Sequence, residues 1–333
     1  MENIFTQQTR PDQLPGKKIL ITGASGFIGS HLCRVLIKRG CEVHAVSRKE
    51  RDTDCVEMRW WQVDLTDSQE VENLFFRLKP DFVYHLASFV AGSRDLSLVI
   101  PMMNNNFITS VNILNAASKI GCQRLFLIGS MEEPASGNPE ATPSSPYAAA
   151  KWASSAYGRM YHALYQVPVV ILRLFMVYGP DQQDLKKLIP YVITCLLRDE
   201  PPMLSGGQRM VDWIFVEDVV AALVMASQAK DIEGKTIDIG SGELISVKTI
   251  VESLFRMVNP KILPHFGTLA DRQLEQTRVA EIELSKSLLG WHPTTSMEEG
   301  LELTVKWYRQ RFKDAAIEKP ESAQNMMRII SQK

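Results

Sequence analysis

The feature that most constrains this chain is a glycine turn near its N-terminus. The apolar run Ile19–Thr22 leads into Gly23, Gly26 and Gly29, spaced G-x-x-G-x-x-G, and a helical pattern follows. The first two glycines permit a tight turn that a phosphate can approach, and the third lets the helix pack close to the strand. Free N–H groups at the start of the helix can then bind the pyrophosphate of a dinucleotide. The predicted cofactor-binding residues of this turn are Gly23, Gly26, Phe27, Ile28 and Gly29. The alternative is an ordinary glycine-rich turn between a strand and a helix.

Apolar runs and helical patterns alternate over the first half of the chain. The predicted strands are Ile19–Thr22, Glu42–Val46, Arg59–Val63, Phe82–Leu86, Leu125–Ile128 and Val169–Leu172. Helical patterns cover Ser30–Arg39, Ser68–Leu78 and Met103–Lys119, and another begins near Tyr147. This alternation predicts an α/β fold with a Rossmann-like, doubly wound parallel sheet covered on both faces. Ligands of such sheets bind beyond the carboxyl ends of the strands.

The pattern loosens after Pro180, where prolines and glycines break up short elements. We predict a smaller mixed α/β C-terminal lobe that binds substrate and is interleaved with late elements of the main sheet. The predicted boundaries are an N-terminal extension at 1–16, the dinucleotide-binding domain at 17–180, the lobe at 181–315 and a tail at 316–333. After about Arg311 the chain is polar and charged, which predicts a frayed helix or a disordered tail.

The charge and composition of the chain limit the classes of function that it can have. The formal net charge of −1 gives no reason to expect a nucleic-acid partner or a membrane surface. The five cysteines form no C-x-x-C pair, which favours reduced thiols in a cytoplasmic protein. Met1–Gly16 is polar and lacks the apolar centre of a signal peptide, and no apolar stretch approaches the length of a membrane span. We predict no metal site.

The loop after the second strand bears on the choice of cofactor. NAD-binding folds usually place a carboxylate there to bind the ribose hydroxyls. Here Ser47, Arg48 and Lys49 precede the first carboxylate, Glu50. A hydroxyl and two cations suit the 2′-phosphate of NADP(H), and an arginine can also stack on adenine. We therefore expect Ser47 and Arg48 to favour NADP(H), with NAD possible; a solvated basic loop is the alternative.

A second candidate contact with the adenine follows the third strand. Asp64 and Leu65 lie there, and the Asp64 carboxylate could hold the adenine edge. The alternative is that Asp64 caps the next helix.

Tyr147 and Lys151 are the candidate catalytic pair. They are four residues apart at the start of a helical pattern, so they share a helix face. A lysine cation beside the phenol favours the phenolate, which predicts a lowered pKa for Tyr147. The tyrosine could then exchange a proton with a sugar or alcohol oxygen while a hydride moves at the adjacent carbon. Ser130, at the end of the fifth strand, could hydrogen-bond the same oxygen. A surface Tyr/Lys pair is the alternative.

Together these motifs resemble the extended short-chain dehydrogenase/reductases, of the nucleotide-sugar epimerase, dehydratase and reductase kind. The resemblance covers about Lys17 to Tyr308. Its motifs are Thr22–Gly29, Asp64-Leu65, His85-Leu86-Ala87, Asn106, Ser130, Tyr147 with Lys151, Leu172-Arg173, Val177–Pro180, Asp212–Val219 and Leu289–Pro293. It implies that Ser130, Tyr147 and Lys151 are a catalytic triad, with Tyr147 and Lys151 also touching the cofactor. The further implied cofactor contacts are Leu86, Ala87 near the nicotinamide, Ser88 and Asn106, which would support the helix that carries the site. The implied partners are a nucleoside-diphosphate sugar in the C-terminal lobe and a second copy of the chain, paired through the long helices near Asn106 and Tyr147.

The chain departs from this family at three places. Met131 stands where the sugar 4,6-dehydratases have an aspartate, so the usual dehydratase acid is missing. Glu132 could be a second acid/base or contact a sugar hydroxyl; a solvated loop carboxylate is the alternative.

The other two departures concern the substrate diphosphate. Met176 replaces an asparagine that contacts the diphosphate in many relatives, and Val211 replaces an arginine. Arg209, helped by Arg272, could supply that contact from a shifted position, because the arginine fork binds phosphate bidentately. Either arginine could equally lie on the surface.

These observations favour an NADPH-dependent 4-ketoreductase acting on an NDP-4-keto-6-deoxyhexose in deoxysugar biosynthesis. The chain has all three residues of the catalytic triad, it lacks the aspartate that serves as the dehydratase acid, and the loop after its second strand is basic. One alternative is an NDP-sugar epimerase with tightly bound NAD. A 4,6-dehydratase is less favoured, and a non-catalytic NADP(H)-binding regulator is the alternative outside enzymes.

Overall fold

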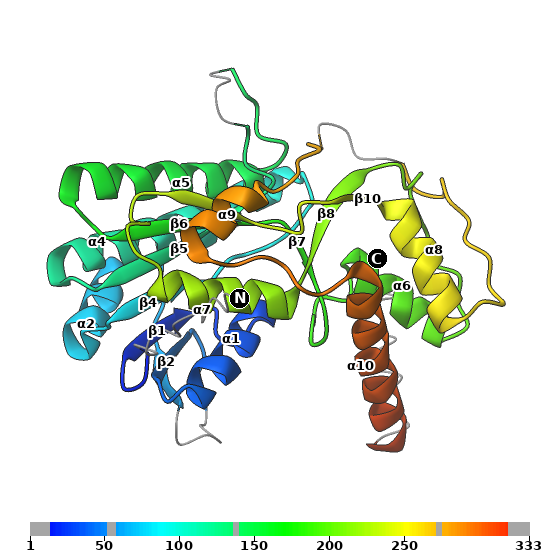
Figure 1. Ribbon diagram of the computed structural model, residues 1–333, viewed down its shortest axis with the longest axis horizontal. Coiled ribbons are helices and arrows are strands. Elements are labelled where there is room, and N and C mark those ends of the chain that lie inside the picture. Colours follow the sequence, from blue (N-terminus) through cyan, green and yellow to red (C-terminus); the bar gives the residue numbers. More distant parts are fainter. Residues whose placement is uncertain (1–13, 52–57, 136–139, 271–274, 319–333) are drawn as a thin grey trace, which may run out of the picture.

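The computed structural model describes residues 14–51, 58–135, 140–270 and 275–318, with side chains as far as 314. A sheet-based body and a smaller lobe lie side by side (Figure 1). The body contains a seven-stranded sheet of order β3-β2-β1-β4-β5-β6-β9, in which every neighbouring pair is parallel. Its strands are β1 Lys18–Thr22, β2 Glu42–Ser47, β3 Met58–Gln62, β4 Phe82–His85, β5 Arg124–Ser130, β6 Val169–Leu174 and β9 Thr236–Ile239.

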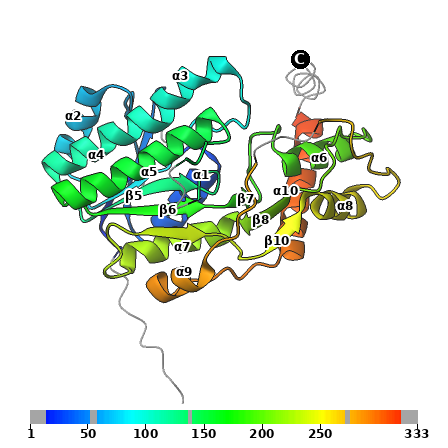
Figure 2. The same cartoon turned by 90° about the horizontal axis from the view of Figure 1, so that it is seen from above.

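Helices cover both faces of this sheet, which confirms the predicted doubly wound α/β fold. Figure 2 shows α2 (Ser68–Leu78), α4 (Thr109–Ile120) and α5 (Pro146–Tyr165) along one face. On the other face α7 (Val216–Gln228) contacts both α1 (Phe27–Lys38) and α9 (Ile282–Leu289). Each face has its own buried apolar cluster, because parallel strands bury side chains on both sides.

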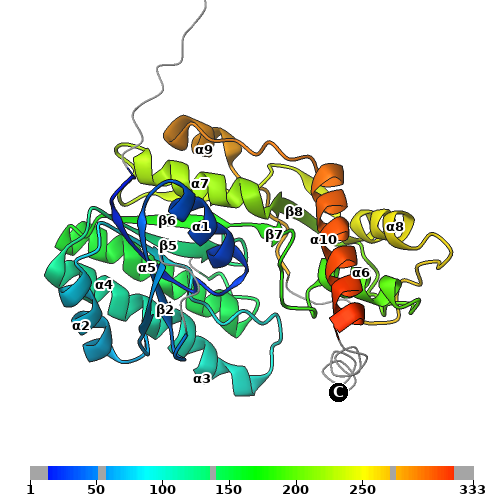
Figure 3. The same cartoon turned by 90° about the horizontal axis from the view of Figure 1, so that it is seen from below.

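The smaller lobe has its own three-stranded sheet, of order β10-β8-β7. β7 (Met176–Tyr178) pairs with β8 (Met210–Phe215) in parallel, and β10 (Leu244–Ser246) pairs with β8 antiparallel. Three helices, α6 (Leu188–Leu197), α8 (Val247–Val258) and α10 (Met297–Glu318), pack together in this lobe (Figure 3). The lobe is therefore the mixed α/β unit that the sequence predicts.

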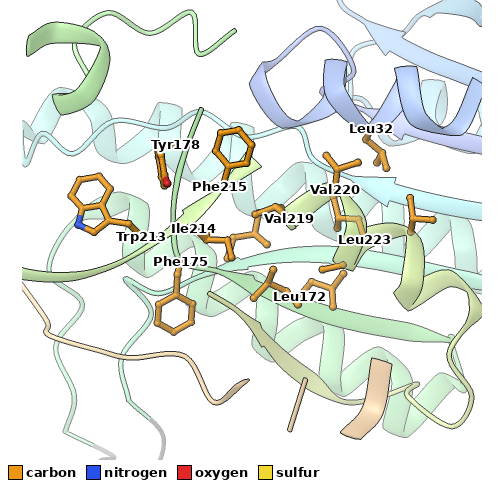
Figure 4. Packing of buried hydrophobic residues seen from close by; sticks show 14 of the residues in the cluster. Leu32, Leu172, Phe175, Tyr178, Trp213, Ile214, Phe215, Val219, Val220 and Leu223 are labelled. Atoms are coloured by element: carbon orange, nitrogen blue, oxygen red, sulfur yellow. The ribbon is translucent and has the colours of Figure 1, made fainter. Parts of the chain in front are cut away.

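The body and the lobe share one apolar core. β6 leads through Phe175 into β7, and β8 leads directly into α7, so the chain crosses between the two parts on short connections. Phe175, Trp213 and Phe215 from these crossings pack with Val219 of α7 in one buried cluster (Figure 4). This shared packing fixes the lobe against the carboxyl edge of the main sheet, where ligands of such folds bind.

Several elements differ in extent from the prediction. α1 begins at Phe27 rather than Ser30, so the glycine turn is shorter than expected. The predicted helix from Met103 is preceded by a 3-10 turn at Leu96–Leu98 (η1) and by α3 at Val99–Met102, and it begins as a π-helical stretch at Met103–Ile108 (η2). α10 continues through Arg311 to Glu318. None of the helices in the described ranges is long and apolar enough to cross a membrane.

Candidate active site

A cavity of about 480 Å³ lies between the carboxyl edge of the sheet and the smaller lobe. Twelve of the predicted site residues line it, and they come from the ends of β1, β4 and β5, from the starts of α1 and α5, and from the segment before β8. They are Gly23, Gly26, Phe27, Ile28, Gly29, Leu86, Ser88, Ser130, Glu132, Tyr147, Lys151 and Arg209.

The glycine turn has the tight geometry that the spacing predicts. Gly23 adopts φ +70°, and a Cβ there would lie 2.7 Å from the backbone N of Ala87. A Cβ at Gly29 would lie 2.2 Å from the carbonyl oxygen of Gly23. Gly26 is the N-cap of α1 and supplies no side-chain hydrogen bond to the first N–H groups of this helix, whose first residues, Phe27, Ile28 and Gly29, line the cavity. The turn thus fits the pyrophosphate of a dinucleotide.

A buried hydrogen-bond chain ties the ends of β1 and β4 to the start of α4. The backbone N of Ala87 donates to the Thr22 hydroxyl (3.1 Å), which lies 2.8 Å from Nδ1 of His85. On the other side, Nε2 of His85 lies 3.5 Å from the hydroxyl of Thr109, which donates to the carbonyl of Asn105. Since the Thr22 hydroxyl is already an acceptor, we assign the proton of neutral His85 to Nε2. Burial lowers the pKa of His85 to about 3.

Asn106 does not line the cavity but stabilises the loop after β4 through hydrogen bonds. Its Oδ1 accepts from the backbone N of Phe89 (2.6 Å) and from the Ser88 hydroxyl (3.1 Å), and its Nδ2 donates to the carbonyl of Phe89. Its own carbonyl accepts from the Ser154 hydroxyl of α5. Asn106 thereby joins the π-helical stretch, the loop and the helix that carries Tyr147.

Tyr147 and Lys151 share one face of α5, but the lysine does not lower the pKa of the phenol as predicted. Burial raises the pKa of Tyr147 to about 12, opposed by hydrogen bonds with Ser130 and Ser88. The Lys151 Nζ lies 5.9 Å from the centre of the Tyr147 ring and donates to the carbonyl of Ile128 (3.0 Å). Burial also lowers the pKa of Lys151, to about 8. Desolvation of the phenolate therefore outweighs the two hydrogen bonds that favour it.

Glu132 and Arg209 were predicted for separate roles, and the structure brings them together. Nη2 of Arg209 donates to Oε1 of Glu132 (2.8 Å), and Nε of Arg209 lies 3.1 Å from Oε2 of Glu275. Glu275 also lines the cavity and was missed, because it lies 66 residues from Arg209 in a segment without a strand or helix pattern. Arg272 lies outside the described residues.

A second carboxylate that the sequence left without a role is Glu133. It is buried, and its Oε1 accepts from the backbone N of Ser130 (2.7 Å) and from the hydroxyl of Ser155 (3.0 Å). Burial raises the pKa of Glu133 despite these bonds. This carboxylate therefore fixes the backbone of Ser130 against α5. Its sequence position, in a polar loop, did not distinguish it from a solvated residue.

The remaining predicted cofactor contacts lie outside the lining of the cavity. Arg48 is exposed and donates to Oδ1 of Asn105 (3.5 Å), and Ser47 ends β2. Asp64 accepts from the backbone N and the hydroxyl of Thr66, and Leu65 follows it. The cap of α2 is Asp67, not Asp64, so the capping alternative for Asp64 is wrong.

The fold and the site together define a nucleotide-binding α/β protein of the doubly wound class, with a Ser-Tyr-Lys group beside its glycine turn. The model of the NAD dependent epimerase/dehydratase family matches residues 19–240, and the chain belongs to that family. The predicted relationship and the prediction of an NAD(P)-dependent enzyme are thereby confirmed.

Individual relatives match over nearly their whole length. The chain is 30% identical to dTDP-glucose 4,6-dehydratase of Haemophilus influenzae, over 87% of this chain and 97% of that protein. It is 27% identical to UDP-glucuronate 4-epimerase of Thermodesulfobacterium geofontis, over 87% and 96%. Among solved structures, UDP-glucuronic acid 4-epimerase of Bacillus cereus, in complex with UDP-glucuronic acid and NAD, is 28% identical with a TM-score of 0.77 and covers 88% of this chain and 99% of its own.

Proposed function

We propose that this protein is a nucleotide-sugar 4-epimerase that retains NAD(H). The observation that carries the proposal is one cavity that joins the glycine turn to Ser130 and Tyr147 and reaches Arg209 of the smaller lobe. Such a cavity can hold a dinucleotide and a second ligand with their reactive ends together. The similar epimerases, one of them solved with NAD and a UDP-sugar, favour this reading over the reductase that the sequence favours.

The roles of the residues follow from their positions. A nicotinamide cofactor, held at Gly23, Gly26 and Gly29, would supply the hydride acceptor and donor for inversion at the sugar C4. Tyr147 exchanges the proton of the C4 oxygen, and Ser130, which hydrogen-bonds Tyr147, holds that oxygen. Lys151 supplies positive charge beneath the phenol, and Glu133 keeps the Ser130 backbone in place. Pre-oriented donors of this kind stabilise the developing charge on the oxygen.

The same cavity disfavours dehydration of the sugar. Met131 lines it and is buried, and a thioether cannot protonate a leaving hydroxyl. The nearby carboxylate, Glu132, is held in an ion pair by Arg209. A 4,6-dehydratase would need another proton donor at this position.

A second candidate is the NADPH-dependent reduction of an NDP-4-keto-6-deoxyhexose, and two observations support it. The loop after β2 presents Ser47, Arg48 and Lys49, a set that suits a 2′-phosphate. The raised pKa of Tyr147 keeps the phenol protonated, ready to donate to an oxygen that receives a hydride. The two candidates differ in cofactor turnover, because an epimerase regenerates NAD and a reductase consumes NADPH.

The decisive experiment identifies the cofactor that copurifies and titrates the stripped protein with NADH and NADPH. Retained NAD, with interconversion of C4 epimers and no net change in cofactor absorbance, supports the epimerase. Loose binding with a preference for NADPH, and its oxidation in step with a ketosugar, supports the reductase. Arg48→Ala serves as the matched variant: under the epimerase proposal NADH and NADPH are affected alike, whereas a selective loss of NADPH binding favours the reductase.

A further inference from the structure

The last residues of β5 extend beyond the end of the neighbouring strand β4. The pairing of β4 with β5 ends at Leu127, whereas β5 continues to Ser130. Backbone groups that lose a neighbouring strand need other partners. Two ionisable side chains supply them here. The Nζ of Lys151 donates to the carbonyl of Ile128 (3.0 Å), and Oε1 of Glu133 accepts from the backbone N of Ser130 (2.7 Å). A basic and an acidic side chain are thus bound two residues apart at the end of one strand.

The space for the Glu133 carboxylate depends on Gly129, which lies between those two backbone positions. A Cβ at Gly129 would lie 2.7 Å from Oε1 of Glu133. The hydroxyl of Ser155, one turn after Lys151 on α5, donates to the same Oε1 (3.0 Å). Glu133 is 3% exposed and Lys151 is 5% exposed. The carboxylate is therefore fixed between the end of β5 and the face of α5 that carries Lys151.

The charged groups around Glu133 come from three elements of the fold. Arg173 of β6 faces Glu133, but its guanidinium is paired with Asp238 (2.6 Å). Arg278, before α9, donates to the backbone carbonyl of Glu133 (3.4 Å). Lys151 of α5 is the third, and burial lowers its pKa to about 8 while the charge of Glu133 opposes that shift. Without this carboxylate, burial would lower the pKa of Lys151 further.

We propose that Glu133 is the buried counter-charge that keeps Lys151 protonated, and that it acts as a positioning residue for the proposed reaction. Glu133 does not belong to the lining of the cavity, whereas Ser130 and Lys151 do, so it acts through these two residues. A charged Lys151 stabilises negative charge that develops on the oxygen of Tyr147. The catalytic part of the inference rests on the proposed function, but the charge of Lys151 can be measured without a substrate.

The first experiment titrates Lys151 by NMR in the protein purified with the cofactor that it retains. Lysine is labelled with ¹³C at Cε and followed from neutral to alkaline pH, and Lys151→Arg assigns the signal. Glu133→Gln keeps an acceptor for the Ser130 N–H and removes the charge, so the midpoint of Lys151 should fall by about one pH unit or more. An unchanged midpoint in folded Glu133→Gln overturns the inference.

The control variant is Glu252→Gln, which removes a carboxylate on α8 far from the cavity lining. The side chain of Glu252 is 41% exposed and lies 4.0 Å from Lys248. The midpoint of Lys151 should be the same in this variant as in the unmodified protein. An equal shift in Glu252→Gln and Glu133→Gln would assign the effect to the net charge of the chain and overturn the inference.

A reciprocal measurement decides the question if Glu133→Gln does not fold. The coupling between two titrating groups is mutual, so removal of the cation must act on the carboxylate. Lys151→Met should therefore raise the titration midpoint of Glu133, measured by NMR of ¹³C-labelled glutamate carboxyls, by about one pH unit or more. A Glu133 midpoint that Lys151→Met leaves in place overturns the inference.

Turnover tests the role of Glu133 in the reaction. Conversion of UDP-glucose and of UDP-glucuronate to their C4 epimers is followed against pH. In Glu133→Gln the alkaline limb of kcat should move to lower pH together with the Lys151 midpoint, while KM changes little. A kcat profile that stays in place while the midpoint moves overturns the positioning role. If neither sugar is converted by the unmodified protein, the proposed function fails, and the NMR midpoints still decide the charge of Lys151.

Discussion

The protonation state of Tyr147 depends on burial, neighbouring charges and hydrogen bonds, which shift its pKa in opposite directions. Burial and the charges of Glu133 and Glu132 raise its pKa, while hydrogen bonds with Ser130 and Ser88 lower it, and the result is about 12. A phenol in this state gives up its proton only to a strong base, such as the alkoxide that forms when a ketone receives a hydride. The same hydroxyl must accept a proton when the sugar is oxidised. Catalysis at this site therefore depends on one oxygen atom.

Tyr147→Phe removes that oxygen and leaves the ring. We expect turnover to fall by at least about 10²-fold, the usual range for a lost acid/base group, because Ser130 cannot take over proton transfer alone. Cofactor binding should change little, since the glycine turn and Asn106 are untouched. Turnover and cofactor affinity are measured side by side. Tyr165→Phe, at the exposed end of the same helix, is the matched control. A Tyr147→Phe protein with a near-normal rate would remove Tyr147 from the mechanism.

Among the elements, β1, β4 and α4 depend on the buried chain through Thr22, His85 and Thr109. His85 stays neutral there, with its pKa lowered to about 3 by burial, whereas an unfolded histidine titrates near 6.5. Between about pH 3 and pH 6.5 the unfolded chain therefore binds a proton on this histidine that the folded chain does not. This contribution to stability is therefore complete above pH 6.5 and is lost as the pH falls toward 3.

The expected slope from His85 is about 1.4 kcal/mol of unfolding free energy per pH unit below pH 6.5. His85→Asn keeps one acceptor and one donor but does not titrate, so its stability should depend less on pH by that amount. Urea denaturation of both proteins between pH 7 and 5 measures their free energies of unfolding. Subtracting one pH dependence from the other cancels the contributions of the other titratable groups. His292→Asn, an exposed site, is the control. Parallel pH curves for the unmodified protein and His85→Asn would contradict the burial argument.

Features that depend on residues close together in the sequence could be predicted, whereas those that depend on long-range contacts could not. The glycine turn and the strand–helix alternation depend on spacing within a few residues, so both were predicted, as was the order of the β-α units. The Arg209–Glu132 pair joins residues 77 positions apart, and the burial of Glu133 depends on α5 packing over β5. The predicted shift in the pKa of Tyr147 was wrong in direction for the same reason. Desolvation of the phenol depends on the tertiary structure and leaves no local pattern in the sequence.

At the scale of the whole molecule, one apolar patch lies along the side of the body next to the site. The patch consists of Leu96, Val99, Ile100 and Met103 from η1, α3 and η2, and Tyr157 from α5, each at least 39% exposed. α3 and η2 both contact α5, so these side chains form a continuous surface. Apolar patches of this kind usually mark an interface. The resemblance to the extended short-chain dehydrogenase/reductases implies a pairing of these same helices.

We therefore predict a homodimer that buries this patch about a two-fold axis, because an isologous interface lets the same helices meet their copies. Sedimentation equilibrium should give about twice the chain mass of 37.6 kDa. Ile100→Glu places a charge in the centre of the patch, so it should shift the protein toward the monomer at least about 10-fold in Kd. Leu263→Glu, at an exposed apolar site in the smaller lobe, should not. Because η2 carries Asn106, which braces the loop beside Tyr147, loss of the dimer should also lower turnover. A monomeric unmodified protein, or an Ile100→Glu dimer of unchanged affinity, would remove this surface as the interface.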